Sequence, residues 1–273
     1  MARTRSWGRR LAVIAALVLS AAAAAAVSSP ADLAEAFAED VDRRLQVPPQ
    51  EADRYAALAE RAFAQAYIRP EGAQYLVVVD RDPEVQALLL FWRSAEGQYR
   101  LVGSAPVSTG NPGSFDHFAT PVGVFDHGPW TPDFRAEGTF NSNGIRGFGV
   151  KGMRVFDFGW QRAPKGWGDG AVMEMRLLMH ATDPDALERR LGSAQSKGCV
   201  RIPASLDRLL DHYGVLDAEY ERLVREGHEL WVLDPARQPV ADAGRYLVVV
   251  DSARDERPQW SPPPAPLPRR ALR

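Results

Sequence analysis

The sequence is poor in cysteine, with one such residue, Cys199, among 273. Because a disulfide needs two cysteines, no internal disulfide can stabilise this chain. A lone thiol is an inert buried side chain, an intermolecular partner or a chemically active group. The residues around Cys199 therefore decide which of these three interpretations applies.

The sequence also lacks an excess of positive charge. It has 33 Lys and Arg residues against 35 Asp and Glu, a formal net charge of −2 at pH 7. Without the four arginines of the N-terminal segment, this charge falls to −6. No basic patch of the kind that nucleic-acid-binding domains carry is present. These features exclude a general nucleic-acid-binding function, and no nucleic acid is expected as a partner.

Long hydrophobic runs are absent except at the N-terminus. There LAVIAALVL (11–19) follows four arginines and precedes SAAAAAAVSS. A positive start, an apolar run and small residues are the layout of a secretory signal peptide, predicted over 1–26. The alternative is an uncleaved anchor, but the alanine-rich half is weakly hydrophobic for a membrane span. We therefore expect an exported protein of the periplasm or cell envelope that meets the membrane only transiently, through this signal.

After the signal the chain changes character several times, and about 245 residues remain, enough for one large core. Apolar residues recur at helical spacing in 30–67, behind the cap pair Ser29-Pro30. Short apolar or alternating runs then predict strands at 75–80, 87–93, 98–110, 228–234 and 246–251. Helices are expected at 204–213 and 216–226. The predicted fold class is mainly β (α+β), divided into a helical extension (27–71), a β-rich domain (72–235), a closing strand (236–256) and a Pro-rich disordered tail (257–273).

Metal and cofactor signals are weak. Gly147, Gly149 and Gly152 form a G-x-G-x-x-G pattern, but the residues after it read as a strand, whereas a dinucleotide site needs a helix there. We expect this loop to line a substrate groove or to form a turn. The four histidines other than His180 show no metal-ligand spacing with the cysteine. No metal and no cofactor are predicted; these histidines are His117, His127, His212 and His228.

The segment before Cys199 contains the remaining histidine, His180. Met173, Met175, Leu177 and Met179 alternate with more polar residues, so a strand here places the odd positions toward the core and His180 on the other face. Asp183-Pro184 then predicts a cap and a short helix that ends at Gly192. After this short helix, a polar loop leads the chain back toward the strand, so Cys199 is expected to lie beside His180.

A thiol with an ordinary pKa of about 8.5 needs a base to become a nucleophile at neutral pH. An imidazole within hydrogen-bond reach supplies that base. Gly198 removes side-chain bulk and frees backbone N–H groups for a developing oxyanion. If residues 199–202 are extended, Cys199 and Arg201 share one face, and Arg201 either fixes the loop or pairs with a substrate carboxylate. From these residues alone, a catalytic pair and an inert buried cysteine remain equally supported.

The order His, 15 residues, then Ser-x-Gly-Cys-Val-Arg resembles the catalytic domain of the L,D-transpeptidase family (YkuD-type), which cross-links bacterial peptidoglycan. TPVGVF (120–125) is similar to the Thr-Pro-x-Gly-x-Phe element of that family, and PVSTG (106–110) to the strand and turn before it. The resemblance covers about residues 72–235. It implies a β-sandwich-like domain in which peptidoglycan stem peptides are the partners.

The resemblance also implies the chemistry. Cys199 would attack the carbonyl of the third residue of a stem tetrapeptide, release D-alanine and form a thioester. A stem amine would resolve the thioester as a 3→3 cross-link; with water as the acceptor, the enzyme would be an L,D-carboxypeptidase. By the same resemblance His180 is the base and Ser196 orients it. Gly198 and Cys199 are backbone oxyanion donors, and Arg201 is the motif arginine.

Two positions depart from the family pattern. Lys197 stands where the family usually has histidine, and Ala181 stands where glycine usually follows the base. Lys197 is expected to lower the pKa of the thiol, whereas Ala181 matters only if its backbone needs a positive φ. A sortase-like enzyme does not fit, because its histidine and arginine lie much farther from the cysteine. The alternative of another class is a catalytically impaired peptidoglycan-binding protein on the same fold. The sequence does not indicate an oligomeric state.

Overall fold

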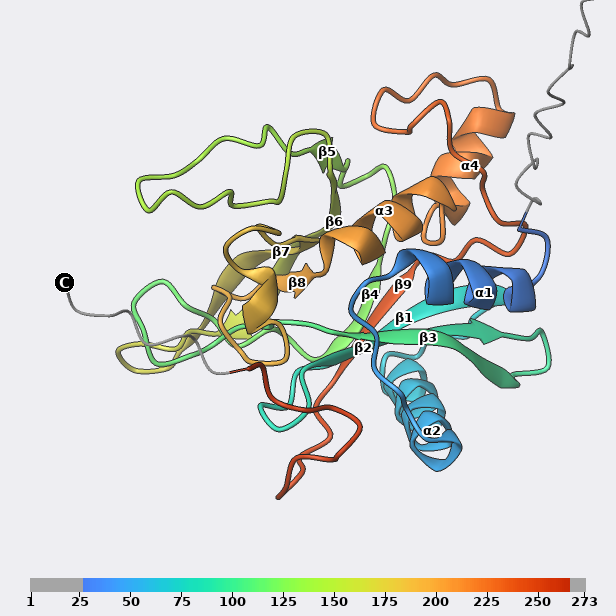
Figure 1. The fold of residues 1–273 in the computed structure, drawn as a ribbon. Helices are drawn as coiled ribbons and strands as arrows, with labels where there is room; N and C mark the ends of the chain where they lie inside the picture. The colour runs from blue at the N-terminus through green and yellow to red at the C-terminus, as the bar shows by residue number, and fades with distance from the viewer. Residues whose placement is uncertain (1–26, 266–273) are drawn as a thin grey trace, which may run out of the picture.

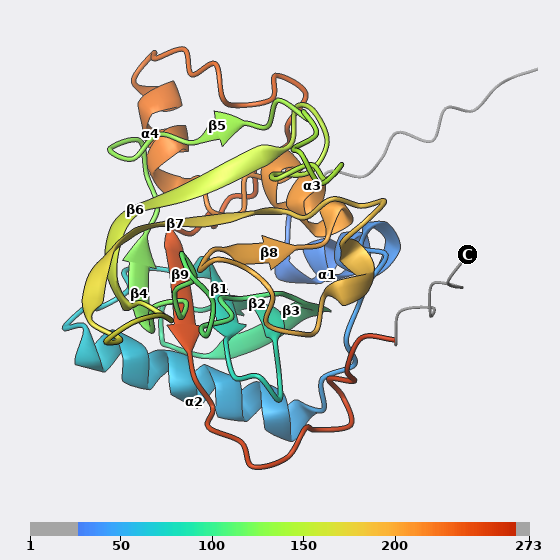
Figure 2. The same ribbon diagram turned by 90° about the vertical axis from the view of Figure 1, so that its left-hand side faces the viewer.

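The strands form two sheets, which a computed structural model describes over residues 27–265. The predicted signal segment (1–26) and residues 266–273 lie outside the described part of the chain. One sheet has the order β3-β2-β1-β9-β4 and the other the order β5-β6-β7-β8. Figures 1 and 2 show the second sheet stacked over one face of the first. The strands are β1 (Gln74–Asp80), β2 (Ala87–Arg93), β3 (Tyr99–Pro106), β4 (Gly123–Asp126), β5 (Phe134–Arg135), β6 (Arg154–Pro164), β7 (Val172–Ala181), β8 (Val200–Ile202) and β9 (Tyr246–Val250).

The main core lies between the two sheets. Every residue of β1 is buried, and alternate side chains such as Val77 and Val79 face Leu177 and Met179 of β7 across this core. Two buried sheets that share an apolar core form a sandwich-like arrangement. The predicted mainly β, α+β fold class is therefore confirmed.

The two N-terminal helices pack on opposite faces of the five-stranded sheet (Figure 2). α1 (Pro30–Asp40) begins at Ser29, whose hydroxyl accepts the Asp32 N–H in a capping box, and its Phe37 enters the main core. α2 (Pro49–Gln65) places Tyr55 and Phe63 in a second core under the sheet. The segment 27–71 thus supplies one helix to each core of the fold.

Helices α3 (Ala204–His212) and α4 (Ala218–Arg225) occupy the two predicted helical segments. The strand expected at 228–234 is wrong: Val232 and Leu233 pack instead against Tyr220 of α4, and a turn joins the Leu233 N–H to the Leu230 carbonyl at 3.0 Å. An apolar run of this length buries equally well without a strand partner. Within the described residues, no helix is both long and apolar enough to cross a membrane.

The C-terminal end of the described chain is packed onto the fold. Ser261 is fully buried and its hydroxyl donates to the Val85 carbonyl at 2.6 Å. The ring of Trp260 meets that of Tyr55 edge-on, with centroids 5.8 Å apart. The expectation of a disordered tail therefore does not hold for residues 257–265, because an aromatic anchor and a buried hydroxyl hold the proline-rich segment in place.

Candidate functional site

The single cysteine directly precedes β8 and is half-buried. In β8, Val200 and Ile202 enter the main core, whereas Arg201 is only partly covered. This alternation follows from the two-residue period of a strand and confirms the predicted faces. The thiol hydrogen of Cys199 points toward the Arg176 carbonyl, with Sγ 3.9 Å from that oxygen.

A glycine turn presents Cys199, and Thr120 holds this turn. Gly198 has φ +134°, and a Cβ there would lie 2.8 Å from Met175 Sδ, so only glycine fits. The buried Thr120 hydroxyl donates to the Gly198 carbonyl at 2.7 Å and accepts the Gly110 N–H at 2.8 Å. Thr120 is the first residue of TPVGVF, so this element fixes the turn that carries Cys199.

The PVSTG segment forms the other support of the same turn. Gly110 packs against it so closely that a Cβ would lie 3.0 Å from Gly198 Cα. The Thr109 carbonyl accepts the N–H groups of both Gln195 and Ser196, and Ser108 exchanges two backbone hydrogen bonds of 2.9 Å with Arg201. Two segments from the preceding 90 residues therefore hold the loop 195–201 on both sides.

His180 lies on β7 and is 97% covered, since its exposed fraction is 3%. Its Nδ1 lies 2.7 Å from the Ala181 carbonyl oxygen. A carbonyl only accepts, so Nδ1 carries the hydrogen, and in the neutral ring Nε2 has the free lone pair. Burial, with a smaller contribution from the charge of Arg201, lowers the pKa of His180 to about 4. At neutral pH His180 is therefore an uncharged base.

β7 and β8 pair in parallel, which places His180 and Cys199 on one face of the sheet. His180 is in register with Arg201, and Cys199 precedes Arg201 by two residues. The positive charge of Arg201 acts on both groups: it contributes to the lowered pKa of His180 and opposes the rise in the pKa of Cys199. Among the described residues no hydrogen bond joins the imidazole to the thiol, and such bonds often tighten only when substrate binds.

The resting thiol is not a thiolate. Burial raises the pKa of Cys199, while Arg201 and the N–H groups of Leu178 and Cys199 itself oppose part of that shift. Lys197 does not contribute, because its ammonium pairs with Asp116 at 2.6 Å on the surface. The expectation that Lys197 lowers the pKa of the thiol is therefore wrong.

Ser196 and Gly198 act within the cysteine loop in this structure. The buried Ser196 hydroxyl donates to the Cys199 carbonyl at 2.6 Å and accepts the Gly198 N–H at 3.0 Å. Ser196 thus orients the turn that carries Cys199, whereas the Ala181 carbonyl orients His180. Because the Gly198 N–H is already bonded, its predicted role as an oxyanion donor is not met here. The Cys199 N–H lies close to its own sulfur, where it opposes the rise in the pKa of the thiol.

The other site predictions have mixed outcomes. Ala181 continues β7 without a positive φ, so its methyl group fits this position. Met173 is 47% exposed, unlike the other odd positions of β7, because it lies where the strand leaves the core. The short helix expected after Asp183 is a turn and a 3-10 helix, η1 (Glu188–Arg190). The Asp183 carboxylate does cap this turn, accepting the N–H groups of Asp185 and Ala186.

The glycine-rich loop before β6 lies next to the histidine. The ring of Phe148 meets that of His180 edge-on, with centroids 4.8 Å apart. The loop is followed by a strand, as predicted, so it is not a dinucleotide site. It covers a cavity of about 400 Å³, which leads from Phe148 to Phe134. Its lining residues are Phe134, Arg135, Glu137, Gly138, Thr139, Gly147, Phe148 and Gly149.

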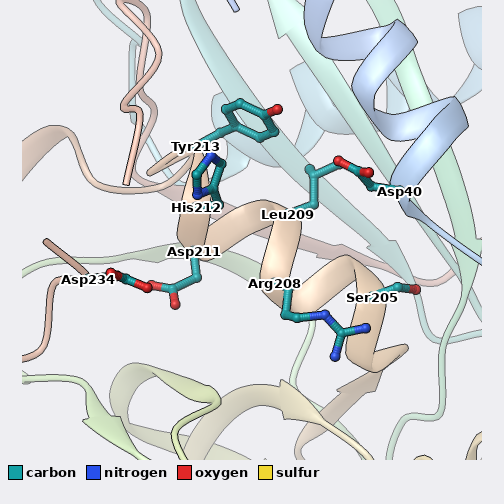
Figure 3. A pocket seen from close by; sticks show the side chains of 8 residues that line it. All are labelled: Asp40, Ser205, Arg208, Leu209, Asp211, His212, Tyr213 and Asp234. Atoms are coloured by element: carbon teal, nitrogen blue, oxygen red, sulfur yellow. The ribbon is translucent and has the colours of Figure 1, made fainter. Parts of the chain in front are cut away.

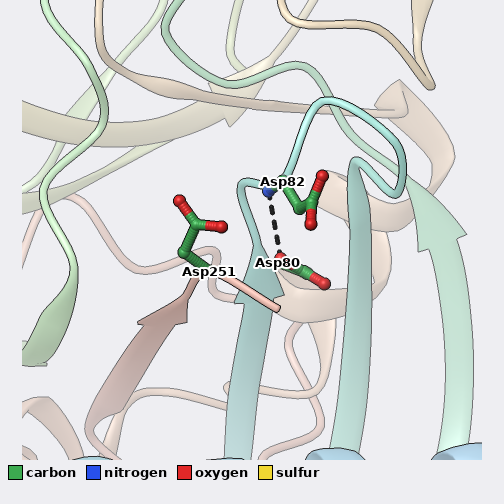
Figure 4. A group of neighbouring side chains, drawn as sticks. All are labelled: Asp80, Asp82 and Asp251. Carbon is green, nitrogen blue, oxygen red and sulfur yellow. Dashed lines mark hydrogen bonds between the residues drawn. The ribbon is translucent and has the colours of Figure 1, made fainter. Parts of the chain in front are cut away.

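A second cavity, of about 500 Å³, opens between α1 and α3, and no predicted site residue lines it (Figure 3). Separately, three carboxylates gather at the ends of β1 and β9: Asp80, Asp82 and Asp251 (Figure 4). Asp80 accepts the Tyr55 hydroxyl at 2.6 Å and the Asp82 N–H at 3.0 Å, and Arg81 pairs with Asp251. Protein donors therefore satisfy this acidic group, which joins the two parallel strands to α2.

A buried charge network behind β6 had no signal in the sequence. The fully buried Arg154 donates to Asp133 at 2.7 Å and, through two nitrogens, to Asp217 at 2.7 Å each. His127 places one ring nitrogen 2.9 Å from Asp133 and the other 2.8 Å from the Leu216 carbonyl. Burial opposes its protonation most strongly, but the charge and hydrogen bond of Asp133, together with the charge of Asp217, outweigh burial and raise the pKa of His127. The network stabilises the connection from β6 to α4, behind the candidate site.

Comparisons with known proteins gave little support. No protein-family model matches the chain, and no curated protein matches it. Among solved structures, one similar chain is the helical cell shape determining protein Pgp2 from Campylobacter jejuni, with 14% identity over 70% of this chain and a TM-score of 0.31. Its K307A mutant gives 11% identity over 85% of this chain and a TM-score of 0.30. The matches span 51% and 58% of those chains, little more than half their length. At these TM-scores they carry no argument about function.

Proposed function

We propose that this protein is a cysteine-dependent L,D-transpeptidase that acts on peptidoglycan stem tetrapeptides in the periplasm or cell envelope. The observation that carries the proposal is the state of His180. Its Nδ1 hydrogen is held by the Ala181 carbonyl and its pKa is about 4, so an uncharged Nε2 base lies on the same sheet face as the half-buried Cys199. The motif resemblance supplies the substrate class.

The proposed reaction begins with a neutral pair. As Cys199 Sγ attacks the carbonyl of the third stem residue, His180 Nε2 takes the thiol proton, which removes the need for a resting thiolate. The negative oxygen of the tetrahedral intermediate meets the Cys199 N–H. The C–N bond to D-alanine then breaks, and the imidazolium returns its proton to the leaving amine.

The thioester is resolved by the same groups in reverse. An acceptor amine attacks the thioester carbonyl and gives its proton to His180, and the departing sulfur regains a proton from the imidazolium. The product is a new amide, the 3→3 cross-link. The guanidinium of Arg201 makes only one hydrogen bond to the described chain, a long one of 3.4 Å to the Gln195 carbonyl. It is therefore free to pair with a substrate carboxylate beside both reacting groups.

The test uses the purified protein with a disaccharide-tetrapeptide, and mass spectrometry of the products. Cross-linked dimer and released D-alanine are expected from the wild type and not from Cys199→Ala. His180→Ala should slow release by about 10²- to 10⁴-fold, the usual value of general acid–base catalysis. His212→Ala, which removes a half-buried histidine from the cavity of Figure 3, is the matched control and should keep full activity.

Two outcomes would change the proposal. D-alanine release without dimer, with an amine acceptor present, identifies an L,D-carboxypeptidase. No release by a folded wild-type protein contradicts the enzyme and favours a peptidoglycan-binding protein on this fold. In that case Lys197→His, which restores the family residue, is the next variant to assay.

A further inference from the structure

A group of aromatic side chains lies next to the turn that carries Cys199. Phe118 contacts this turn: its Cβ lies 3.3 Å from where a Cβ on Gly198 would be. The ring of Phe118 meets Trp167 edge-on at a centroid distance of 5.0 Å, and Trp167 in turn lies 5.5 Å from Phe115. Phe115 is 81% exposed. We call the outer two residues, Phe115 and Trp167, the aromatic ledge.

The loop that bears Phe115 is held in a defined conformation although its aromatic ring faces solvent. The Gly113 N–H donates to the Gly166 carbonyl at 2.9 Å, and the Gly166 N–H donates to the His117 carbonyl at 2.6 Å. Asp116 has φ +62°, a left-handed conformation that Asp adopts in turns, and its carboxylate pairs with Lys197. The loop is therefore held by several contacts although the ring of Phe115 itself is exposed.

Two ion pairs lie next to the ledge. Lys197 binds Asp116, the neighbour of Phe115, at 2.6 Å. Lys165 binds Asp169 at 2.6 Å, with its ammonium 5.8 Å from the Trp167 ring centroid. The ledge therefore offers apolar rings beside charges that neutralise each other in pairs. Such a surface suits an uncharged ligand that has one apolar face and hydroxyl groups at its edge, which is the description of a sugar ring.

The spacing agrees with the proposed substrate. A stem peptide has three residues between the sugar and the carbonyl that Cys199 attacks, and three extended residues span about 10 Å. The two ring-to-ring steps from Phe118, at the turn, to Phe115 are 5.0 and 5.5 Å. A stem whose third residue lies at Cys199 is long enough to place its sugar on the ledge.

We propose that Phe115 and Trp167 bind the saccharide to which the stem peptide is attached, so that the protein prefers glycan-linked stems to free peptides. The identity of the sugar rests on the proposed function. Lys197, in place of the family's usual histidine, then acts through Asp116 as a positioning residue that holds the ledge beside the nucleophile.

Sugar binding is tested first without any peptide. Chitotetraose, an uncharged N-acetylglucosamine tetramer, is titrated into the wild type, Phe115→Ala and Trp231→Ala, and the dissociation constant is measured by calorimetry. Trp231 is 75% exposed in the loop after α4 and is the matched aromatic control. The wild type and Trp231→Ala should bind equally, and Phe115→Ala should bind about three- to tenfold more weakly, the loss expected for one aromatic contact. Absence of binding to the wild type, or equal binding by Phe115→Ala, overturns the proposal.

A second measurement separates this proposal from the proposed function. The rate of D-alanine release is compared for the disaccharide-tetrapeptide and the bare tetrapeptide. The wild type and Trp231→Ala should release D-alanine faster from the disaccharide-tetrapeptide than from the bare tetrapeptide. In Phe115→Ala the ratio of these two rates should fall toward one. Lys197→Met, which frees Asp116, should reduce the preference and make it insensitive to salt. If neither substrate reacts, the proposed enzyme fails, whereas chitotetraose binding still decides the role of the ledge.

Discussion

Replacing Thr120 with valine tests whether its hydroxyl holds the Cys199 turn. Valine has nearly the same shape, so the change removes only the two hydrogen bonds, to the Gly198 carbonyl and from the Gly110 N–H. Both backbone groups are buried, and leaving a buried group without a partner costs about 1 to 3 kcal/mol. The free energy of unfolding should therefore fall by about 2 to 6 kcal/mol, a large part of the usual total of about 5 to 15 kcal/mol.

The assay is urea unfolding, followed by the alkylation rate of Cys199 with iodoacetamide under native conditions. A loosened turn exposes the sulfur and removes the burial that raises its pKa, so Thr120→Val should alkylate faster at pH 7 than the wild type. Thr120→Ser keeps the hydroxyl and should resemble the wild type in alkylation rate.

Thr131→Val is the matched control, because it removes a single partly buried hydrogen bond, to the Asp157 carbonyl at 2.9 Å. It should cost about 1 kcal/mol and leave the alkylation rate unchanged. The reasoning is refuted if Thr120→Val costs no more than Thr131→Val and its thiol reacts at the wild-type rate.

Two further predictions concern pH. Because the pKa of His180 is about 4, the imidazole stays uncharged down to that pH. The rate of D-alanine release should therefore stay level from about pH 7.5 to 5.5 and fall only near pH 4. A midpoint near the ordinary histidine pKa of about 6.5 would contradict this expectation. The buried Asp207 carboxylate has no hydrogen-bond partner within the described residues, and burial, with Asp211 nearby, raises its pKa. Since the folded state then favours the protonated form, stability falls as pH rises above the unfolded value of about 4. In urea unfolding, Asp207→Asn should be more stable than the wild type at pH 8, by about 1.4 kcal/mol for each unit by which the pKa of Asp207 is raised. At pH 4 the two proteins should be equally stable. Equal stability at both pH values would show that the Asp207 carboxylate does not destabilise the folded state at high pH.

Local signals in the sequence identified most of the secondary structure. Ser29-Pro30 specified the start of α1, and the two-residue alternation of Val200, Arg201 and Ile202 specified the faces of β8. The segment 228–234 was misassigned because an apolar run shows only that residues are buried, and Val232 and Leu233 are buried against a helix. The packing of Trp260 on Tyr55 was not predictable from a proline-rich composition, because it depends on a partner about 200 residues earlier.

The sequence predicted the relative placement of His180 and Cys199 but not the residues that support them. The order and spacing of His180 and Cys199 are local features, and strand pairing places both on one face. The hydrogen bonds and ion pairs that hold the Cys199 turn join residues far apart in the sequence. Thr120 reaches Gly198 across 78 residues, and Lys197 reaches Asp116 across 81 residues. Sequence reasoning placed the charge of Lys197 at the sulfur because it could not show the carboxylate that pairs with it.

The position of β9 has a consequence for how the chain folds. This last strand lies in the middle of its sheet, parallel to β1 on one side and antiparallel to β4 on the other, with Leu76 opposite Tyr246. During synthesis, β1 and β4 therefore wait with unpaired edges until the C-terminal part of the chain emerges. Pairings between such distant segments form slowly, and open edges in the meantime are sites where other chains can add. Protection of the nascent chain should thus matter for this protein until its final strand is made.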